Sequence, residues 1–157
     1  MAEKVEMKSL YRVGVVVKDA EKVFSVFEKY FGADRKTIDY TNTTDPHLRY
    51  KDATTNGKPV HYDTKYIIFP LGGIEIELIE PLGDNGLYAE WMAEHGEGLH
   101  HFNVDVDNVH AFEAIMNELN APMVGSGHIE NTLFKYFDAR DTLGMILETC
   151  ERKPFDA

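Results

Sequence analysis

The fold is decided by HFNVDVDNVHAFEAIMNEL at residues 101–119, which repeats the pattern of RVGVVVKDAEKVFSVFEKY at residues 12–30. In each stretch β-branched residues predict a strand. A short polar residue then begins a helix whose apolar side chains recur every three or four positions. A shift of 89 positions aligns the two stretches and pairs Arg12 with His101, Val15 with Val104, Val17 with Val106, Val23 with Phe112, Phe27 with Met116, and Tyr30 with Leu119.

Each of these stretches is followed by further strand patterns. The first is followed by a possible strand at 34–40 and by a hairpin of 64–71 and 74–80 around Gly72 and Gly73; the second is followed by 121–128, 132–137 and 144–151. Near the end of each half, GIEIE at residues 73–77 matches GMILE at residues 144–148, at a shift of 71. The order β-α-β-β-β therefore occurs twice, which predicts an internal duplication of the α+β class.

One domain of 157 residues accommodates this duplication. We expect module one to span about 9–80, a connector with a short helix to span 81–97, and module two to span about 98–152. Between the strand patterns, residues 41–62 lose all periodicity and contain Gly57 and two prolines, so we expect a long loop that is either functional, such as a lid over the site, or disordered.

Charge and composition exclude several classes of protein. The net charge of −11 disfavours nucleic acid as a partner. No apolar stretch is long enough to span a membrane, and the N-terminus has no secretory pattern. A single cysteine, Cys150, excludes an internal disulfide and any zinc site built from cysteines. We therefore expect a cytoplasmic protein.

Two acidic residues stand out because apolar neighbours flank them within strands. Glu77 and Glu148 occupy equivalent positions of the two halves, and a half-buried carboxylate needs a partner or a metal. His101 and Arg12 begin the equivalent first strands. If the two halves pair into one sheet, these four side chains converge on one site. His100 precedes His101, and neighbouring residues of a regular strand face opposite sides, so we expect at most one of them to point at that site.

The motif ELIEPLG at residues 77–83 and the motif GEGLHHFNVDVD at residues 96–107 resemble methylmalonyl-CoA epimerases. The ending from Phe137 to Glu148 resembles the wider glyoxalase/bleomycin resistance/dioxygenase superfamily, also called vicinal oxygen chelate. The resemblance implies that the paired modules form a curved mixed sheet around one divalent metal ion (Co, Zn, Mn, Mg or Ni). It also implies that Glu77, His101 and Glu148 are metal ligands and that the protein is a homodimer.

Arg12 departs from this family, which has a histidine ligand at that position. A guanidinium cannot bind a metal. Two interpretations follow. In the first, the metal is held by Glu77, His101 and Glu148, and Arg12 contacts the substrate. In the second, Arg12 lies between the two carboxylates and replaces the metal. His47 and His61 could reach the site only by a movement of the 41–62 segment.

The resemblance further implies a metal-dependent isomerase that moves a proton next to a carbonyl through an enolate, with a small-molecule substrate such as an acyl-CoA. Glu148 is the expected catalytic residue. The family's second acid or base falls near Lys65 or Tyr66, neither of which is a carboxylate. Two alternatives stay open: a lyase similar to glyoxalase I, and a binding protein of the same fold without catalysis.

Overall fold

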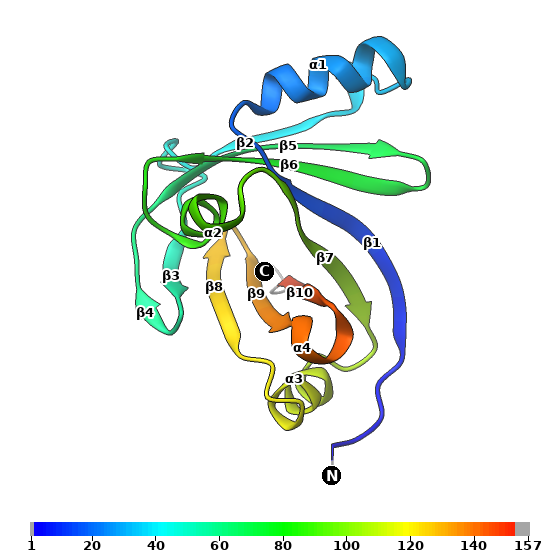
Figure 1. The fold of residues 1–157 in the computed structure, drawn as a ribbon, viewed down its shortest axis with the longest axis vertical. Helices are drawn as coiled ribbons and strands as arrows, with labels where there is room; N and C mark the ends of the chain where they lie inside the picture. The colour runs from blue at the N-terminus through cyan, green and yellow to red at the C-terminus, as the bar shows by residue number, and fades with distance from the viewer. Residues whose placement is uncertain (1, 153–157) are drawn as a thin grey trace, which may run out of the picture.

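The computed structural model describes residues 2–152 of the chain. Within them a single curved sheet of ten strands is accompanied by four α-helices and one 3-10 turn, η1 (Figure 1). The elements of the first half are β1 (Met7–Val16), α1 (Ala20–Tyr30), η1 (Arg35–Thr37), β2 (Asp39–Asn42), β3 (Lys51–Thr55), β4 (Lys58–Pro59), β5 (Asp63–Leu71) and β6 (Ile74–Leu82). Those that follow are α2 (Leu87–His95), β7 (Gly98–Val106), α3 (Val109–Glu118), β8 (Met123–Ile129), β9 (Thr132–Ala139), α4 (Arg140–Leu143) and β10 (Met145–Arg152). None of the helices in this part of the chain has the length and apolar content needed to cross a membrane.

The strand order confirms the predicted duplication. The sheet runs β2-β5-β6-β1-β7-β10-β9-β8-β3-β4, so the two first strands, β1 and β7, meet at the centre. Module two contributes four strands, and module one contributes the equivalent four (β1, β2, β5 and β6) together with the short strands β3 and β4. These two strands are antiparallel, with Arg12 opposite Asn103 and Gly14 opposite His101. The sheet is a curled mixed half-barrel with two pseudo-symmetric βαβββ modules, as the sequence predicts.

The register between the first and the last strand is the same in the two modules. In the first, Gly14 of β1 pairs with Glu77 of β6, and in the second, Asn103 of β7 pairs with Glu148 of β10. Gly14 and Asn103 differ by 89 positions, and Glu77 and Glu148 differ by 71, which are the two shifts that the sequence repeat requires. The equivalence of the two carboxylates is therefore a property of the hydrogen-bonded sheet.

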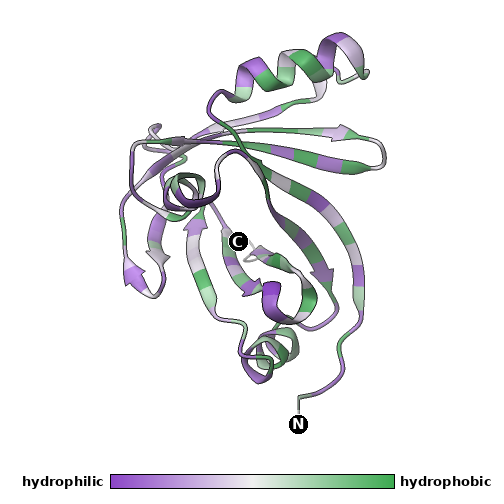
Figure 2. Cartoon of the chain, in the orientation of Figure 1, coloured by the Kyte–Doolittle hydropathy of each residue, from purple (hydrophilic) through white to green (hydrophobic). Residues whose placement is uncertain are grey.

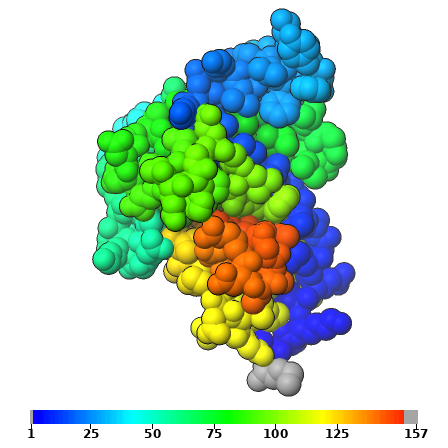
Figure 3. Space-filling model, in the orientation of Figure 1, coloured from blue at the N-terminus to red at the C-terminus, as the bar shows by residue number. Residues whose placement is uncertain are grey.

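The two faces of the sheet have different roles. Alternate residues such as Leu78 and Phe69 on one face pack against α1, and Val104 and Leu147 pack against α3, forming two separate apolar clusters. Figure 2 shows the corresponding alternation of hydrophobic and hydrophilic residues along the strands. The opposite face carries the third cluster, which is rich in tyrosine and includes residues of α2. In Figure 3 α1 covers one end of the molecule, and module two lies toward the other end beside the N-terminal part of β1. Because side chains alternate across a strand, the face away from α1 and α3 is free to form a site.

The predicted loop at 41–62 is wrong in part. Strand β2 extends to Asn42, and β3 and β4 form a hairpin whose first strand pairs with β8 of the other module. Tyr50, Ala53 and Tyr62 are buried in the tyrosine-rich cluster. The segment lacks periodicity because its strands are short, but its buried aromatic residues anchor it to the sheet. Its removal would therefore cost stability, and the segment is not a simple lid.

Candidate metal centre and cavity

Three buried side chains from three neighbouring strands meet on the free face of the sheet. Glu77, His101 and Glu148 are 6%, 0% and 5% exposed. The Nε2 atom of His101 lies 2.8 Å from Oε2 of Glu148 and 3.4 Å from Oε1 of Glu77. Each of the three residues offers one possible ligand atom, and these three atoms all lie within 4.8 Å of one another. The structure thus brings together all three residues that the family resemblance assigns to a metal.

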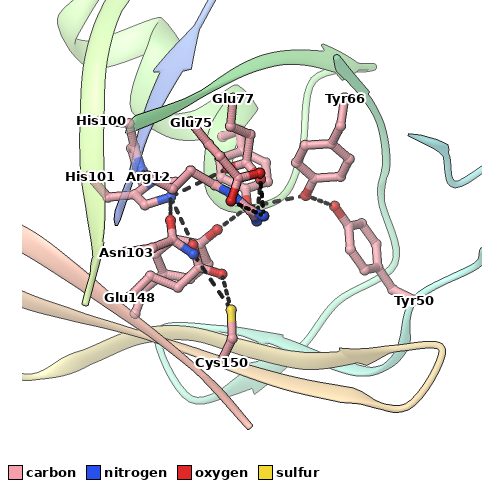
Figure 4. A network of polar contacts seen from close by, with 12 residues as sticks. Arg12, Tyr50, Tyr66, Glu75, Glu77, His100, His101, Asn103, Glu148 and Cys150 are labelled. Atoms are coloured by element: carbon pink, nitrogen blue, oxygen red, sulfur yellow. Dashed lines mark hydrogen bonds and ion pairs between the residues drawn. The ribbon is translucent and has the colours of Figure 1, made fainter. Parts of the chain in front are cut away.

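Arg12 lies beside this group and does not separate the two carboxylates. Its Nη1 atom is 3.6 Å from Oε2 of Glu77, and its Nη2 atom is 3.3 Å from Oε2 of Glu75 (Figure 4). The group between Glu77 and Glu148 is the imidazole of His101. The second interpretation of Arg12 is therefore wrong in its geometry. Sequence reasoning also missed Glu75, although its place two residues before Glu77 puts both side chains on one face of β6.

Each of the two carboxylates has one oxygen held by a neighbour and one oxygen free. Arg12 approaches Oε2 of Glu77, and the thiol of Cys150 donates to Oε1 of Glu148 at 3.3 Å. The other oxygens, Oε1 of Glu77 and Oε2 of Glu148, are buried, and among the described residues they have no hydrogen-bond partner besides Nε2 of His101, which they face. Buried acceptors are normally satisfied. Two free carboxylate oxygens beside an imidazole nitrogen suit a divalent cation, so the residues present fit a metal even with Arg12 nearby.

A β-bulge places both neighbouring histidines on the same site. Gly14 pairs with His101 but Val15 pairs with Leu99, so His100 is an extra residue on β7. Its Nδ1 atom lies 2.8 Å from Nδ1 of His101. Burial and the neighbouring His101 lower the pKa of His100 well below its usual value, so His100 is neutral. It can accept the Nδ1 proton of His101, which leaves Nε2 of His101 directed at the carboxylates and at Oδ1 of Asn103, 3.0 Å away. Such an acceptor fixes the tautomer that a metal ligand needs.

We expect the protein without metal to lose stability above neutral pH because of His101. Burial alone would lower the pKa of His101, but the carboxylates of Glu148 and Glu77 outweigh it and raise the pKa from 6.5 to about 9. A raised pKa stabilises the folded state fully below pH 6.5, and this contribution disappears as the pH rises through about 9. Its size is on the order of 1–3 kcal/mol. Urea unfolding with chelator between pH 6 and pH 10 should show the decline, and His101→Gln should remove most of it. Equal slopes in the two proteins would contradict the assignment.

Gly14 provides the space that the ring of His101 occupies. A Cβ atom at Gly14 would lie 2.1 Å from Cε1 and 2.7 Å from Nε2 of that ring. We therefore expect Gly14→Ala to displace His101, to destabilise the fold by roughly 1–3 kcal/mol, and to weaken the binding of Co²⁺ at least tenfold. Calorimetric titration with Co²⁺ and urea unfolding measure the two effects. Unchanged affinity for Co²⁺ would mean that His101 is not a ligand.

A cavity of about 850 Å³ opens above these residues. Arg12, Glu77 and Glu148 line it, whereas the ring of His101 is fully buried beneath it. Four further tyrosines surround the cavity and join their hydroxyl groups in a row: Tyr50 with Tyr66, Tyr66 with Tyr88 at 3.1 Å, and Tyr88 with Tyr136. Burial raises the pKa of each of them well above its usual value, so these phenols stay protonated. Sequence reasoning missed three of the four, since lone tyrosines in strands indicate only a core.

The two residues near the family's second acid or base line different cavities. Tyr66 lines the cavity, whereas Lys65 faces a separate small cavity, where its Nζ atom lies 3.6 Å from Glu80. His47 and His61 lie outside the large cavity, and the side chain of His61 is 70% exposed near Asp63. Neither of these histidines is brought to the metal centre.

Comparison with known proteins agrees with this architecture. Solved structures with the same fold include a hypothetical protein from Bacillus halodurans C-125 (17% identity, TM-score 0.65, covering 99% of both chains) and methylmalonyl-CoA epimerase from Mycobacterium tuberculosis (15% identity, TM-score 0.67, covering 98% of this chain and 94% of that one). A variant of Streptomyces coelicolor methylmalonyl-CoA epimerase in complex with 2-nitronate-propionyl-CoA is 13% identical, with a TM-score of 0.62, and covers 95% of this chain and 100% of that one. No curated protein matches the sequence. At such identities the structural likeness concerns the fold.

A sequence profile gives the family itself. The profile of the glyoxalase/bleomycin resistance protein/dioxygenase superfamily matches residues 11–135, which is most of the chain and includes the second half of β1, all of β7 and both helices that follow them. Members of this superfamily are typically metal-dependent, which agrees with the Glu-His-Glu group. The chain belongs to the glyoxalase/bleomycin resistance protein/dioxygenase superfamily.

Proposed function

We propose that the protein is a metal-dependent isomerase that removes and returns a proton on the carbon next to a carbonyl group, through an enolate. The observation that carries this proposal is the pair of free, buried carboxylate oxygens beside His101 at the floor of a cavity. The likeness to methylmalonyl-CoA epimerases supports the same chemistry.

Each residue has a role that its position supports. Glu77, His101 and Glu148 would hold a divalent cation, which supplies stabilisation of negative charge on the carbonyl oxygen. Glu148 lines the cavity and is the proposed base, because proton removal needs a carboxylate within reach of the substrate carbon. Arg12 orients Glu77 through its ion pair, and its partly exposed guanidinium is the proposed substrate contact. His100 keeps the proton of His101 on Nδ1.

Proton exchange tests the proposal directly. The protein is loaded with Co²⁺ in D₂O and mixed in parallel with methylmalonyl-CoA and with the neutral thioester propionyl-N-acetylcysteamine. NMR then follows loss of the α-proton signal. Exchange of either probe that requires both the cation and Glu148 supports an enolate-forming enzyme. Binding of a probe without any exchange would contradict it and would favour a binding protein of the same fold.

Tyr66 is the proposed second proton carrier, on the cavity wall. Its protonated hydroxyl lines the cavity, and it comes from β5, not from β10, which carries Glu148. We expect Tyr66→Phe to retain exchange of the α-proton but to slow inversion at that carbon about 100-fold, since inversion needs a donor on the second face. A chiral 2-methylbutanoyl-N-acetylcysteamine thioester allows both rates to be measured on one sample. An equal fall in both rates would exclude this role.

A further inference from the structure

The charged groups that line the cavity are almost all acidic. Six carboxylates and one guanidinium face it, which gives a formal charge of −5: Asp39, Glu75, Glu77, Asp105, Glu130 and Glu148, against Arg12. A divalent cation at the floor would still leave the lining negative. This local excess has the same sign as the net charge of the whole chain, −11.

The one guanidinium of the lining, that of Arg12, already forms ion pairs with carboxylates of the protein. Arg12 contacts Glu75 and Glu77 and lies four-fifths buried between them. Asp105 and Glu130 line the cavity and are exposed to solvent, so we take them to mark its entrance, and neither forms an ion pair within residues 2–152. An entering anion would therefore meet unpaired carboxylates before it reached a positive charge, and it would have to compete with Glu75 and Glu77 for Arg12.

Most of the remaining polar lining is neutral. Six of the eight tyrosines of the chain line the cavity: Tyr11, Tyr40, Tyr50, Tyr66, Tyr88 and Tyr136. Phenols donate hydrogen bonds to carbonyl and hydroxyl oxygens, and their rings attract positive charge. The free oxygens of Glu77 and Glu148, both in residues more than nine-tenths buried, mark the same cavity as a place where a ligand is held.

We propose that this cavity accepts a small carbonyl substrate without net negative charge and discriminates against coenzyme A thioesters. The inference rests on the proposed function for the identity of the site and narrows its substrate class. Coulomb repulsion between the phosphate groups of coenzyme A and the acidic entrance is long-ranged in a cleft with low-dielectric walls, and salt weakens it. The structural neighbour in complex with a coenzyme A derivative shares only the fold at 13% identity, so its ligand does not decide the substrate of this chain.

Two probes with the same acyl group separate the alternatives. Propionyl-CoA and propionyl-N-acetylcysteamine present the same carbonyl and differ in the phosphate-bearing part. Calorimetry on the Co²⁺-loaded protein at low ionic strength should give a dissociation constant at least tenfold higher for the coenzyme A thioester, which is about 1.4 kcal/mol. Raising the salt concentration should reduce the difference between the two dissociation constants, because it should strengthen only the binding of propionyl-CoA.

The entrance carboxylates provide the decisive variant. Asp105→Asn combined with Glu130→Gln should improve propionyl-CoA binding threefold or more relative to binding of the neutral thioester. Glu90→Gln, an exposed acid on α2 outside the cavity, should change neither constant. Equal or tighter binding of propionyl-CoA by the unmodified protein, without salt dependence, would overturn the inference. Binding and proton exchange are separate readouts: the predicted binding preference without exchange of either probe would leave this inference standing and refute the proposed function.

Discussion

Glu148→Gln should lower the rate of α-proton exchange by about 10³-fold, within the range expected for loss of a general base. The amide keeps the volume and one oxygen of the side chain but cannot take up a proton. Glu148 lies in β10, where it pairs with Tyr136 of β9 and Asn103 of β7. Strand pairing on both sides therefore holds its backbone in place even when the side-chain charge is removed. We therefore expect the fold to persist, with a loss of less than about 2 kcal/mol when Co²⁺ is present.

A matched control is available on the same strand. Glu151 lies three residues further along β10, on the opposite face of the sheet and outside the cavity. Glu151→Gln should leave the exchange rate within twofold of the unmodified protein. If Glu148→Gln unfolds the protein or retains full exchange, Glu148 is structural and not catalytic.

Arg12→Ala should destabilise the metal-free protein by roughly 3–5 kcal/mol, the cost of leaving a buried carboxylate without its cation. Glu77 would keep only His101 as a positive neighbour, and Glu75 would lose its partner. The loss should shrink when Co²⁺ is added, because a cation at Oε1 of Glu77 compensates for the missing guanidinium. Urea unfolding of both proteins, with chelator and with Co²⁺, measures the difference.

Lys would be an uninformative replacement at this position, since it keeps the charge, whereas Arg12→Gln keeps a polar side chain and removes the charge. Arg12→Gln should behave like Arg12→Ala in unfolding. A destabilisation that Co²⁺ does not reduce would mean that Arg12 and a metal do not share Glu77, and would remove the structural basis for placing a cation beside it.

The duplication could be predicted from the sequence because the spacing of apolar residues repeats in the two halves. Shifts of 89 and 71 positions reappear as the register that pairs Gly14 with Glu77 and Asn103 with Glu148. This register brings Glu77, His101 and Glu148 to one place, so the candidate ligands follow from the repeat and the family resemblance together.

Other features depend on three-dimensional packing and could not be predicted. The role of Gly14 appears only when the ring of His101 is seen to occupy the missing side chain's place. The contact between His100 and His101 requires a bulge that breaks the alternation assumed for a regular strand. The hairpin of β3 and β4 pairs with the other module, and such long-range pairing leaves little periodicity in a short segment.

Titration of the metal-free protein with Co²⁺ by calorimetry, beside the variant Arg12→His, tests the central claim most directly. If Glu77, His101 and Glu148 form a metal centre, the unmodified protein binds one Co²⁺, and Arg12→His binds it at least tenfold more tightly, about 1.4 kcal/mol, because a repelling charge is replaced by an imidazole ligand. If the unmodified protein binds no Co²⁺ and its melting temperature does not respond to chelator, while Arg12→His binds the ion, the three-ligand centre is contradicted and the proposed enolate chemistry falls with it.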